Sequence, residues 1–184
     1  MSLMRDRSAS QAYWDRLYEQ RTEPMRFGHD DITYRLGAEF IGDLPVEDWG
    51  CGLGWFRKFA QGPYTGVDGS LSCFTDELAD LREYRSRTPA LFMRHVLEHN
   101  PFEWRIILDN ALTSFMQRMV LVIHTPMHDL EFLVRNAEPP DVSLSWDDLT
   151  ARFLSDITWR HQQISTATTY GVENVFYLER PVVQ

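Results

Sequence analysis

The segment Val46–Trp55, with the sequence VEDWGCGLGW, places three glycines on alternate positions just after an acid. The residues before the glycines are partly apolar, and Trp55–Ala60 (WFRKFA) is typical of the first turns of a helix. The segment therefore predicts a short buried strand, a tight turn and then a helix. Glycine lacks a Cβ atom, so such a turn can bend sharply and can approach a ligand closely.

The residues around this segment predict alternating strands and helices. Helices are expected at about 12–20, at 30–42 and from Pro101 onward, where proline suits the first helical position. The further strands are expected at Tyr64–Asp68, Leu78–Leu81, Ala90–Val96 and Arg118–His124. These strands are apolar rather than alternating, which is typical of a parallel sheet covered on both faces.

The last third of the chain has a different pattern. Ser145 and the acids after it resemble a helix cap, followed by apolar residues at helical spacing. Two strand-like segments, 157–169 and 175–178, flank a turn-like stretch and predict an antiparallel hairpin at the sheet edge. The expected fold is α/β: a doubly wound, mostly parallel, Rossmann-like sheet with an antiparallel C-terminal hairpin.

The composition limits the function classes. The chain has 184 residues, 43% hydrophobic and 24% charged, which fits one globular domain. No apolar run is long enough for a membrane helix, and no signal peptide is recognisable, so a cytoplasmic protein is expected. The net charge of −9 argues against nucleic acid, because phosphate-binding proteins usually carry a basic face. The segment with the most basic residues, 82–87, is interpreted as a solvent-exposed loop.

Cysteines and histidines give no motif for a metal. Cys51 and Cys73 do not form a CxxC pair, and free thiols in a reducing compartment are expected. The six histidines do not cluster with cysteines at zinc-ligand spacing, so the sequence predicts no metal site.

Three glycine-rich motifs compete for the opening segment. The dinucleotide fingerprint GxGxxG fails in both registers, because Trp55 or Arg57 stands where the last glycine is needed. The phosphate loop GxxxxGK[ST] fails because no lysine follows a suitable glycine. The pattern acid-x-GxGxG is met at every position, by Asp48, Gly50, Gly52 and Gly54. It resembles the first motif of class I S-adenosylmethionine-dependent methyltransferases.

Electrostatics favours this resemblance over a nucleotide site. An acid beside the turn would repel a pyrophosphate, whereas Asp48 can attract a sulfonium or an ammonium group. Three further segments resemble the family in the expected order: Asp68 at a strand end, Ala79–Leu81, and His95–His99 (HVLEH) after the fourth strand. The resemblance covers about residues 46–125. Only eleven residues separate Asp68 from Asp80, so the usual helix between these strands is shortened or missing.

The resemblance implies a set of site residues. Asp68 would bind the ribose hydroxyls, Asp80 the exocyclic amine of adenine, and Leu81 the adenine ring. The complete set of residues implied to contact S-adenosylmethionine, or its product S-adenosylhomocysteine, is Asp48, Gly50, Cys51, Gly52, Asp68, Gly69, Asp80, Leu81 and His95. His95 is the candidate catalytic base, and its alternative role is to pack against the adenosine or to bond the backbone.

The segments outside 46–125 are the candidates for acceptor recognition. Glu98 is expected to favour the N-terminus of the following helix electrostatically. His124, Thr125, His128 and Asp129 are candidates for acceptor contacts, and the 126–145 loop is long enough to be a lid. Tyr13, Trp14 and Tyr18 form either an aromatic lid over the donor or a stripe packed on the core.

The expected organisation is one methyltransferase-like domain over 1–184. It comprises an N-terminal helical segment (1–42), a donor-binding core (46–125) and a loop, helix and edge hairpin (126–184). The expected activity is methyl transfer from S-adenosylmethionine to a small-molecule acceptor of unknown identity. One alternative is a non-catalytic S-adenosylmethionine-binding module acting as a subunit or regulator; another is a nucleotide-binding oxidoreductase. The sequence does not indicate an oligomeric state.

Overall fold

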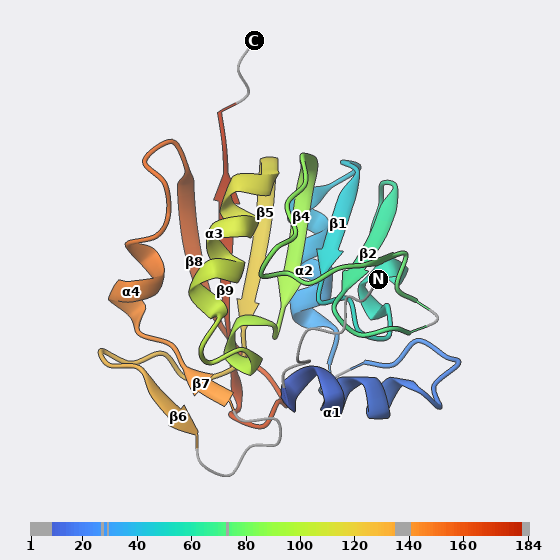
Figure 1. Cartoon of the computed structure of the whole chain (residues 1–184). Coiled ribbons are helices and arrows are strands. Elements are labelled where there is room, and N and C mark those ends of the chain that lie inside the picture. The colour runs from blue at the N-terminus through green and yellow to red at the C-terminus, as the bar shows by residue number, and fades with distance from the viewer. Residues whose placement is uncertain (1–8, 27, 29, 73, 135–140, 182–184) are drawn as a thin grey trace.

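A seven-stranded sheet forms the centre of the molecule (Figure 1). The computed structural model describes residues 9–26, 28, 30–72, 74–134 and 141–181. The strand order is β3-β2-β1-β4-β5-β9-β8; the first five strands in this order are mutually parallel, and β9 runs antiparallel to both of its neighbours, β5 and β8. The strands are β1 (Val46–Trp49), β2 (Tyr64–Asp68), β3 (Glu77–Leu78), β4 (Thr88–Arg94), β5 (Phe115–Ile123), β8 (Thr158–Ser165) and β9 (Val172–Glu179).

Alternate residues of the central strands enter two separate cores. On β4, Leu91 and Met93 join the cluster that includes Leu108 of helix α3 (Trp104–Ser114). Phe92, between them, joins the cluster that includes Ala38 of helix α2 (Ile32–Ile41). The helices therefore cover opposite faces of the sheet, with α3 in front and α2 behind in Figure 1. Each fully buried side chain of this size contributes about 1.5–3 kcal/mol, so both faces hold the sheet together.

The carboxyl ends of the parallel strands all lie at one edge of the sheet, the lower edge in Figure 1. Helix α1 (Ala9–Tyr18) lies across this edge below β1 and β2. A separate two-stranded sheet, β6 (Phe132–Val134) paired with β7 (Asp141–Ser143), lies at the same edge below β8. The edge where ligands bind in doubly wound folds is thus enclosed by segments from both ends of the chain.

The predicted α/β fold with its antiparallel hairpin is confirmed, but several element predictions are wrong. The helix expected from Pro101 begins at Trp104. The predicted helix at 55–60 is a single 3₁₀ turn, η1 (Trp55–Lys58), so no full helix follows the glycine turn. The predicted strand 78–81 is shortened to β3, and Asp80 lies in the turn after it. Among the described residues no helix is both long and apolar enough to span a membrane.

The short connection from β2 to β3 contains no helix in its described part, as the sequence predicted. Side chains bond the backbone there instead. The Ser72 hydroxyl donates to the carbonyl of Gly52 over 2.8 Å, and the Asp76 carboxylate accepts from the amide of Gly66 over 2.7 Å. These bonds satisfy backbone groups that a helix would otherwise satisfy. Cys73 lies outside the described residues.

The C-terminal third contains the predicted hairpin and a shorter helix than expected. The Ser145 hydroxyl accepts a hydrogen bond from the amide of Asp148, which confirms the predicted cap of helix α4 (Trp146–Thr150). The helix ends after five residues, before the apolar positions 153 and 154 that suggested a longer one. Strand β9 inserts beside β5 and carries β8 to the sheet edge. This insertion brings residues from the C-terminal part of the chain to the carboxyl edge of the sheet.

Candidate functional site

One cavity opens at the carboxyl edge of the sheet, above the glycine turn. All nine residues that the sequence implied for donor contact line it: Asp48, Gly50, Cys51, Gly52, Asp68, Gly69, Asp80, Leu81 and His95. They come from the ends of β1, β2 and β4 and from the turn after β3. Parallel strands end at the same edge, which is why residues distant in sequence converge there.

The three glycines of the turn all adopt positive φ angles. Gly50, Gly52 and Gly54 have φ values of 74°, 52° and 67°, a conformation that side chains disfavour. A Cβ atom on Gly50 would also lie 2.3 Å from Cγ2 of Val96, far closer than van der Waals contact allows. The chain therefore needs glycine at position 50 both for its backbone conformation and for the close approach of the segment after β4.

Asp68 anchors the glycine turn from the end of β2. Its carboxylate accepts hydrogen bonds from the amide of Gly52 over 2.8 Å and from the amide of Ser70 over 2.7 Å. Burial raises the pKa of Asp68 to about 6, although the amides of Ser70 and Gly52 favour the ionised form. A carboxylate has about four lone-pair sites, so two further hydrogen bonds can be accepted from a ligand.

Asp48 supplies a second buried acid to the same cavity. Its Oδ2 accepts a hydrogen bond of 2.8 Å from the hydroxyl of Tyr64. Burial raises the pKa of Asp48 to about 7, against the opposing effect of the Tyr64 hydrogen bond. The cavity thus holds two acids that are costly to ionise and that a cationic ligand would stabilise in the ionised form.

The other predicted donor-contact residues Asp80 and Leu81 already bond other residues of the protein. Asp80 already pairs with Arg82, whose Nε lies 2.9 Å from Oδ1, and this bond lowers the pKa of Asp80. Leu81 is buried, and its carbonyl accepts from the side-chain amide of Asn110. Burial raises the pKa of Cys51 far above its ordinary value, so the thiol stays protonated and is suited to contact rather than to nucleophilic attack.

Helix α1 forms one wall of the cavity. Trp14 and Tyr18 both line it, and their rings stack with centroids 5.8 Å apart. Tyr13 packs edge-on against Trp14 rather than lining the cavity. Trp14 and Tyr18 thus face the cavity and also pack against each other, so the choice between a lid and a packed stripe stays open.

His95 has an unusual backbone conformation directly after β4. Its φ of 57° is the one positive value among the non-glycine residues that the structure describes. Its Nε2 contacts Oε1 of Glu173, a fully buried residue on β9. Arg94 Nη2 lies 2.6 Å from the same oxygen, and the Thr33 hydroxyl donates to the other oxygen over 3.2 Å. Strained positions of this kind are common at functional sites.

The surroundings of His95 favour a neutral imidazole. Burial, followed by the charge of Arg94, lowers the pKa of His95 well below its ordinary value. Nε2 faces the carboxylate of Glu173 and is assigned the proton on that ground, which leaves Nδ1 as the proton acceptor. This arrangement of an oriented, neutral histidine is the one that a general base needs. The sequence identified His95 but missed Arg94 and Glu173.

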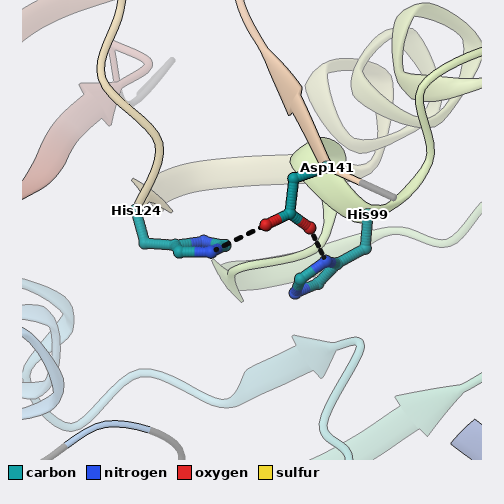
Figure 2. Close-up of side chains that lie close together, drawn as sticks. All are labelled: His99, His124 and Asp141. Carbon is teal, nitrogen blue, oxygen red and sulfur yellow. Dashed lines mark hydrogen bonds and ion pairs between the residues drawn. The ribbon is translucent and has the colours of Figure 1, made fainter. Parts of the chain in front are cut away.

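Beside His95 lies a second group, formed by His99, His124 and Asp141 (Figure 2). The carboxylate of Asp141 lies between the two imidazoles: Oδ1 is 2.6 Å from Nδ1 of His99, and Oδ2 is 3.5 Å from Nε2 of His124. The hydroxyl of Tyr170 donates to Oδ2 over 3.0 Å. The three side chains come from the 3₁₀ turn after β4, the end of β5 and the start of β7.

Glu98 supports this group from inside the protein. Its Oε1 accepts hydrogen bonds from the backbone amide of His124 over 2.7 Å and from Nδ1 of the same residue over 2.6 Å. The expected helix-capping role of Glu98 is therefore not observed. Although burial disfavours the charged imidazole, hydrogen bonds with Asp141 and Glu98 raise the pKa of His124 to about 9. His124 is thus held between two carboxylates.

The other candidates for acceptor contacts do not join the site. Thr125 is buried and donates to the carbonyl of Val142, which is a structural role. His128 and Asp129 are exposed on the segment before β6. Pro139 and Pro140, in the expected lid loop, lie outside the described residues. Two signals in the sequence could have indicated the missed residues: the unusual length of the 126–145 loop, which contains Asp141, and the polar 171–174 segment at the start of β9.

Comparisons with known proteins identify the fold. No protein-family model matches the chain, and no curated protein matches it by sequence. Magnesium protoporphyrin IX methyltransferase from Synechocystis PCC 6803 with bound SAM is similar in structure, with a TM-score of 0.63, 14% identity and coverage of 98% of this chain and 100% of that one. At these identities the likeness establishes the Rossmann-like methyltransferase fold.

Two further solved structures share this fold. The 1,6-didemethyltoxoflavin-N1-methyltransferase of Burkholderia thailandensis, with bound 1,6-didemethyltoxoflavin and S-adenosylhomocysteine, has a TM-score of 0.64 and 13% identity, covering 82% of this chain and 79% of that one. The [4+2]-cyclase SpnF has a TM-score of 0.59 and 13% identity, covering 95% and 94%. The fold thus occurs in proteins described as methyltransferases and in one described as a cyclase.

Proposed function

We propose that the cavity binds S-adenosylmethionine and that the protein transfers its methyl group to a small-molecule acceptor. The observation that carries this proposal is the convergence of nine implied donor contacts on one cavity, beside a glycine turn where a Cβ atom on Gly50 would collide with Val96. Two fold neighbours contain SAM or S-adenosylhomocysteine, which supports the same ligand here.

The charges of the cavity suit this ligand. S-adenosylmethionine supplies an activated methyl group on a cationic sulfur and also carries an ammonium group. Asp48 and Asp68 are both buried at the cavity and are both costly to ionise without a cation. Pairing with a cation offsets this cost, whereas an anionic pyrophosphate would increase it. The two acids therefore favour a sulfonium nucleoside over a dinucleotide.

His95 is proposed to act as the general base. Its neutral imidazole would accept the proton of a hydroxyl or ammonium acceptor at Nδ1, while Glu173 holds Nε2. The acceptor atom would form its bond to the methyl carbon as the carbon–sulfur bond breaks. The electron pair of that bond stays on sulfur, which becomes the neutral thioether of S-adenosylhomocysteine. Alignment of the two reactants supplies much of the rate enhancement in such a displacement.

The acceptor is proposed to enter between α1 and the β6–β7 pair, which enclose the carboxyl edge of the sheet. In this proposal residues 1–184 act as one domain, in which 46–125 bind the donor and the flanking segments select the acceptor. A cytoplasmic location is proposed because Cys51 is a free thiol. A small molecule rather than nucleic acid is proposed because the net charge is −9.

The alternative function is binding of S-adenosylmethionine without methyl transfer. One fold neighbour, the [4+2]-cyclase SpnF, is named for a reaction other than methylation. The same fold can therefore serve a function without methyl transfer, which favours this alternative. Calorimetry with S-adenosylmethionine and S-adenosylhomocysteine tests the shared first step. Formation of S-adenosylhomocysteine with a metabolite extract then separates the two functions. Donor binding without product across several extracts would support the binding module, and no binding of either nucleoside would refute both.

A further inference from the structure

We propose that His99, His124 and Asp141 bind a divalent first-row transition-metal ion. The sequence predicted no metal site, since these residues are separated by 24 and 16 intervening positions and match no short ligand motif. The fold brings them together at the cavity edge, where one ligand atom from each lies within 4.8 Å of the other two. Figure 2 shows the three side chains pointing toward one another.

The distances between the ligand atoms fit a common ion. Nitrogen and oxygen ligands bind zinc at about 2.0–2.2 Å, which places ligand atoms on the order of 3 Å from one another. One oxygen of Asp141 lies 2.6 Å from Nδ1 of His99, and the other lies 3.5 Å from Nε2 of His124. One distance is shorter and the other longer than this expected separation. The widest pair has to close by about an ångström or somewhat more, which side-chain rotation can provide.

Glu98 gives His124 the orientation that a metal-binding histidine requires. The carboxylate holds Nδ1 of His124 at 2.6 Å, so Nε2 is the nitrogen that faces Asp141. A second carboxylate that fixes the far nitrogen in this way is the usual support of a histidine ligand. The other oxygen of Glu98 is buried and has no hydrogen-bond partner among the described residues. A buried carboxylate oxygen without a partner is costly, and a nearby cation reduces that cost.

The charge balance and the ligand types indicate the class of ion. Imidazoles that bind a metal ion are neutral, so in the ion-bound state the divalent ion would neutralise the two negative charges of Glu98 and Asp141. Two imidazoles and one carboxylate suit zinc, iron or cobalt better than calcium or magnesium, which prefer oxygen ligands. Three protein ligands leave coordination positions open, as in catalytic rather than structural sites.

The proposed site borders the cavity, because His99, one of its three ligands, is part of the cavity lining. His95, the proposed base, lies beside His124, and the centroids of the two tilted rings are 4.4 Å apart. The next step, and only this step, rests on the proposed methyl transfer. If that transfer takes place, the ion would bind an oxygen atom of the acceptor. The acceptor class would then be a compound with a hydroxyl, phenol or carboxylate oxygen beside the methylated atom.

The experiment titrates chelator-treated, full-length protein with Co²⁺ and reads the visible absorption of the ion, with Zn²⁺ calorimetry in parallel. The proposal expects one equivalent of ion, displaced by Zn²⁺, and at least about tenfold weaker binding by Asp141→Asn and His99→Gln. His128→Gln is the matched control, because this exposed histidine lies on the same segment outside the group. It should bind like the wild type.

Two readouts keep the result interpretable. If a variant fails to fold by circular dichroism, the histidine ring protons of the wild-type protein are followed by NMR as Zn²⁺ is added. Selective shifts of His99 and His124 support the site. Absence of Co²⁺ bands, of Zn²⁺ heat and of ring shifts would overturn it, as would equal binding by wild type and Asp141→Asn. Calorimetry with S-adenosylmethionine on the same samples separates failure of the metal site from failure of the proposed function.

Discussion

The carboxylate of Asp68 accepts a hydrogen bond from the backbone amide of Gly52, which fastens the end of β2 to the glycine turn after β1. This bond gives Asp68 two tasks, because the same carboxylate is proposed to bind the ribose of the donor. A change at Asp68 should therefore alter both the stability of the turn and the affinity for the nucleoside.

Asp68→Ala is expected to weaken S-adenosylhomocysteine binding by about 1.5–3 kcal/mol, the range for hydrogen bonds to a charged group. The variant also leaves the amides of Gly52 and Ser70 without their acceptor, so the free energy of unfolding should fall by about 1–3 kcal/mol. Calorimetry and urea unfolding measure the two effects. Glu77→Ala, an exposed acid on β3, is the control and should change neither. An unchanged dissociation constant in Asp68→Ala would remove Asp68 from the site.

Gly50→Ala should destabilise the protein far more than Gly171→Ala. Both glycines have φ near 70°, so both substitutions strain the backbone by about 1–2 kcal/mol. A Cβ atom on Gly171 would meet open space, whereas one on Gly50 would lie 2.3 Å from Val96. The clash adds about 1–3 kcal/mol at position 50. Equilibrium unfolding of the two variants tests the difference, and equal losses would show that the approach of Val96 is not tight.

The Val96→Ala background provides a second test of the same contact. If the clash with Val96 limits position 50, then Gly50→Ala should cost less in this background, with a coupling energy of about 0.5–3 kcal/mol. A coupling near zero in the double-mutant cycle would assign the whole effect of Gly50→Ala to its backbone conformation.

Folding stability should depend on pH through Asp48 and Asp68. Burial raises their pKa values to about 7 and about 6, above the unfolded value of about 3.9. The folded state therefore binds more protons than the unfolded state between about pH 4 and pH 7. The stabilisation from these groups is present in full below about pH 4 and is lost as pH rises through 6 and 7. Urea unfolding from pH 5 to 8 should show Asp48→Asn gaining stability relative to wild type as pH rises, and parallel profiles would contradict this.

Donor binding should have the opposite dependence on pH. A cationic ligand pairs with the ionised acids, so S-adenosylmethionine should bind more tightly as pH rises from about 5 to about 8. S-adenosylhomocysteine lacks the sulfonium charge and should show a weaker trend. Calorimetry across this range, with Asp48→Asn as the comparison, measures both slopes. A steeper trend for S-adenosylhomocysteine than for S-adenosylmethionine would exclude the proposed pairing with the sulfonium.

His95→Asn should separate binding from methyl transfer. Asparagine tolerates the positive φ of this position, so the turn after β4 should be retained. Loss of the proposed base should lower kcat by about 10²–10⁴-fold for an acceptor that needs deprotonation, while donor affinity stays within a few-fold. Single-turnover assays with an acceptor found in the extract screen measure this. Full activity in His95→Asn would exclude His95 as the general base.

The parallel sheet and the glycine turn could be predicted from sequence because their signals are local. Apolar runs such as Val120–Ile123 and the spacing of Gly50, Gly52 and Gly54 lie within a few residues, and the fold follows from their order. The 3₁₀ turn at Trp55–Lys58 could not be predicted in this way. Its apolar residues suit a helix, and tertiary packing decides between the two conformations.

The site residues that could not be predicted from sequence are those that pair with residues far away in the chain. His95 and Glu173 are separated by 78 positions, and His99 and Asp141 by 42. Neither carboxylate is part of a motif, and only the insertion of β9 beside β5 and the placement of β7 bring them to the histidines. Sequence patterns predicted the residues on the early strands, whereas the partners that orient them follow from topology.

The contact between His95 and Glu173 has a consequence for biosynthesis. The residues implied to contact the donor all lie between Asp48 and His95. This part of the chain can begin to fold while translation continues, since domains fold as their residues emerge. The imidazole meets its carboxylate only after the hairpin at the far end has been made and has docked. A nascent chain would thus be able to hold the nucleoside before it is able to use it, and the chemical competence of the protein would be the last property that folding completes.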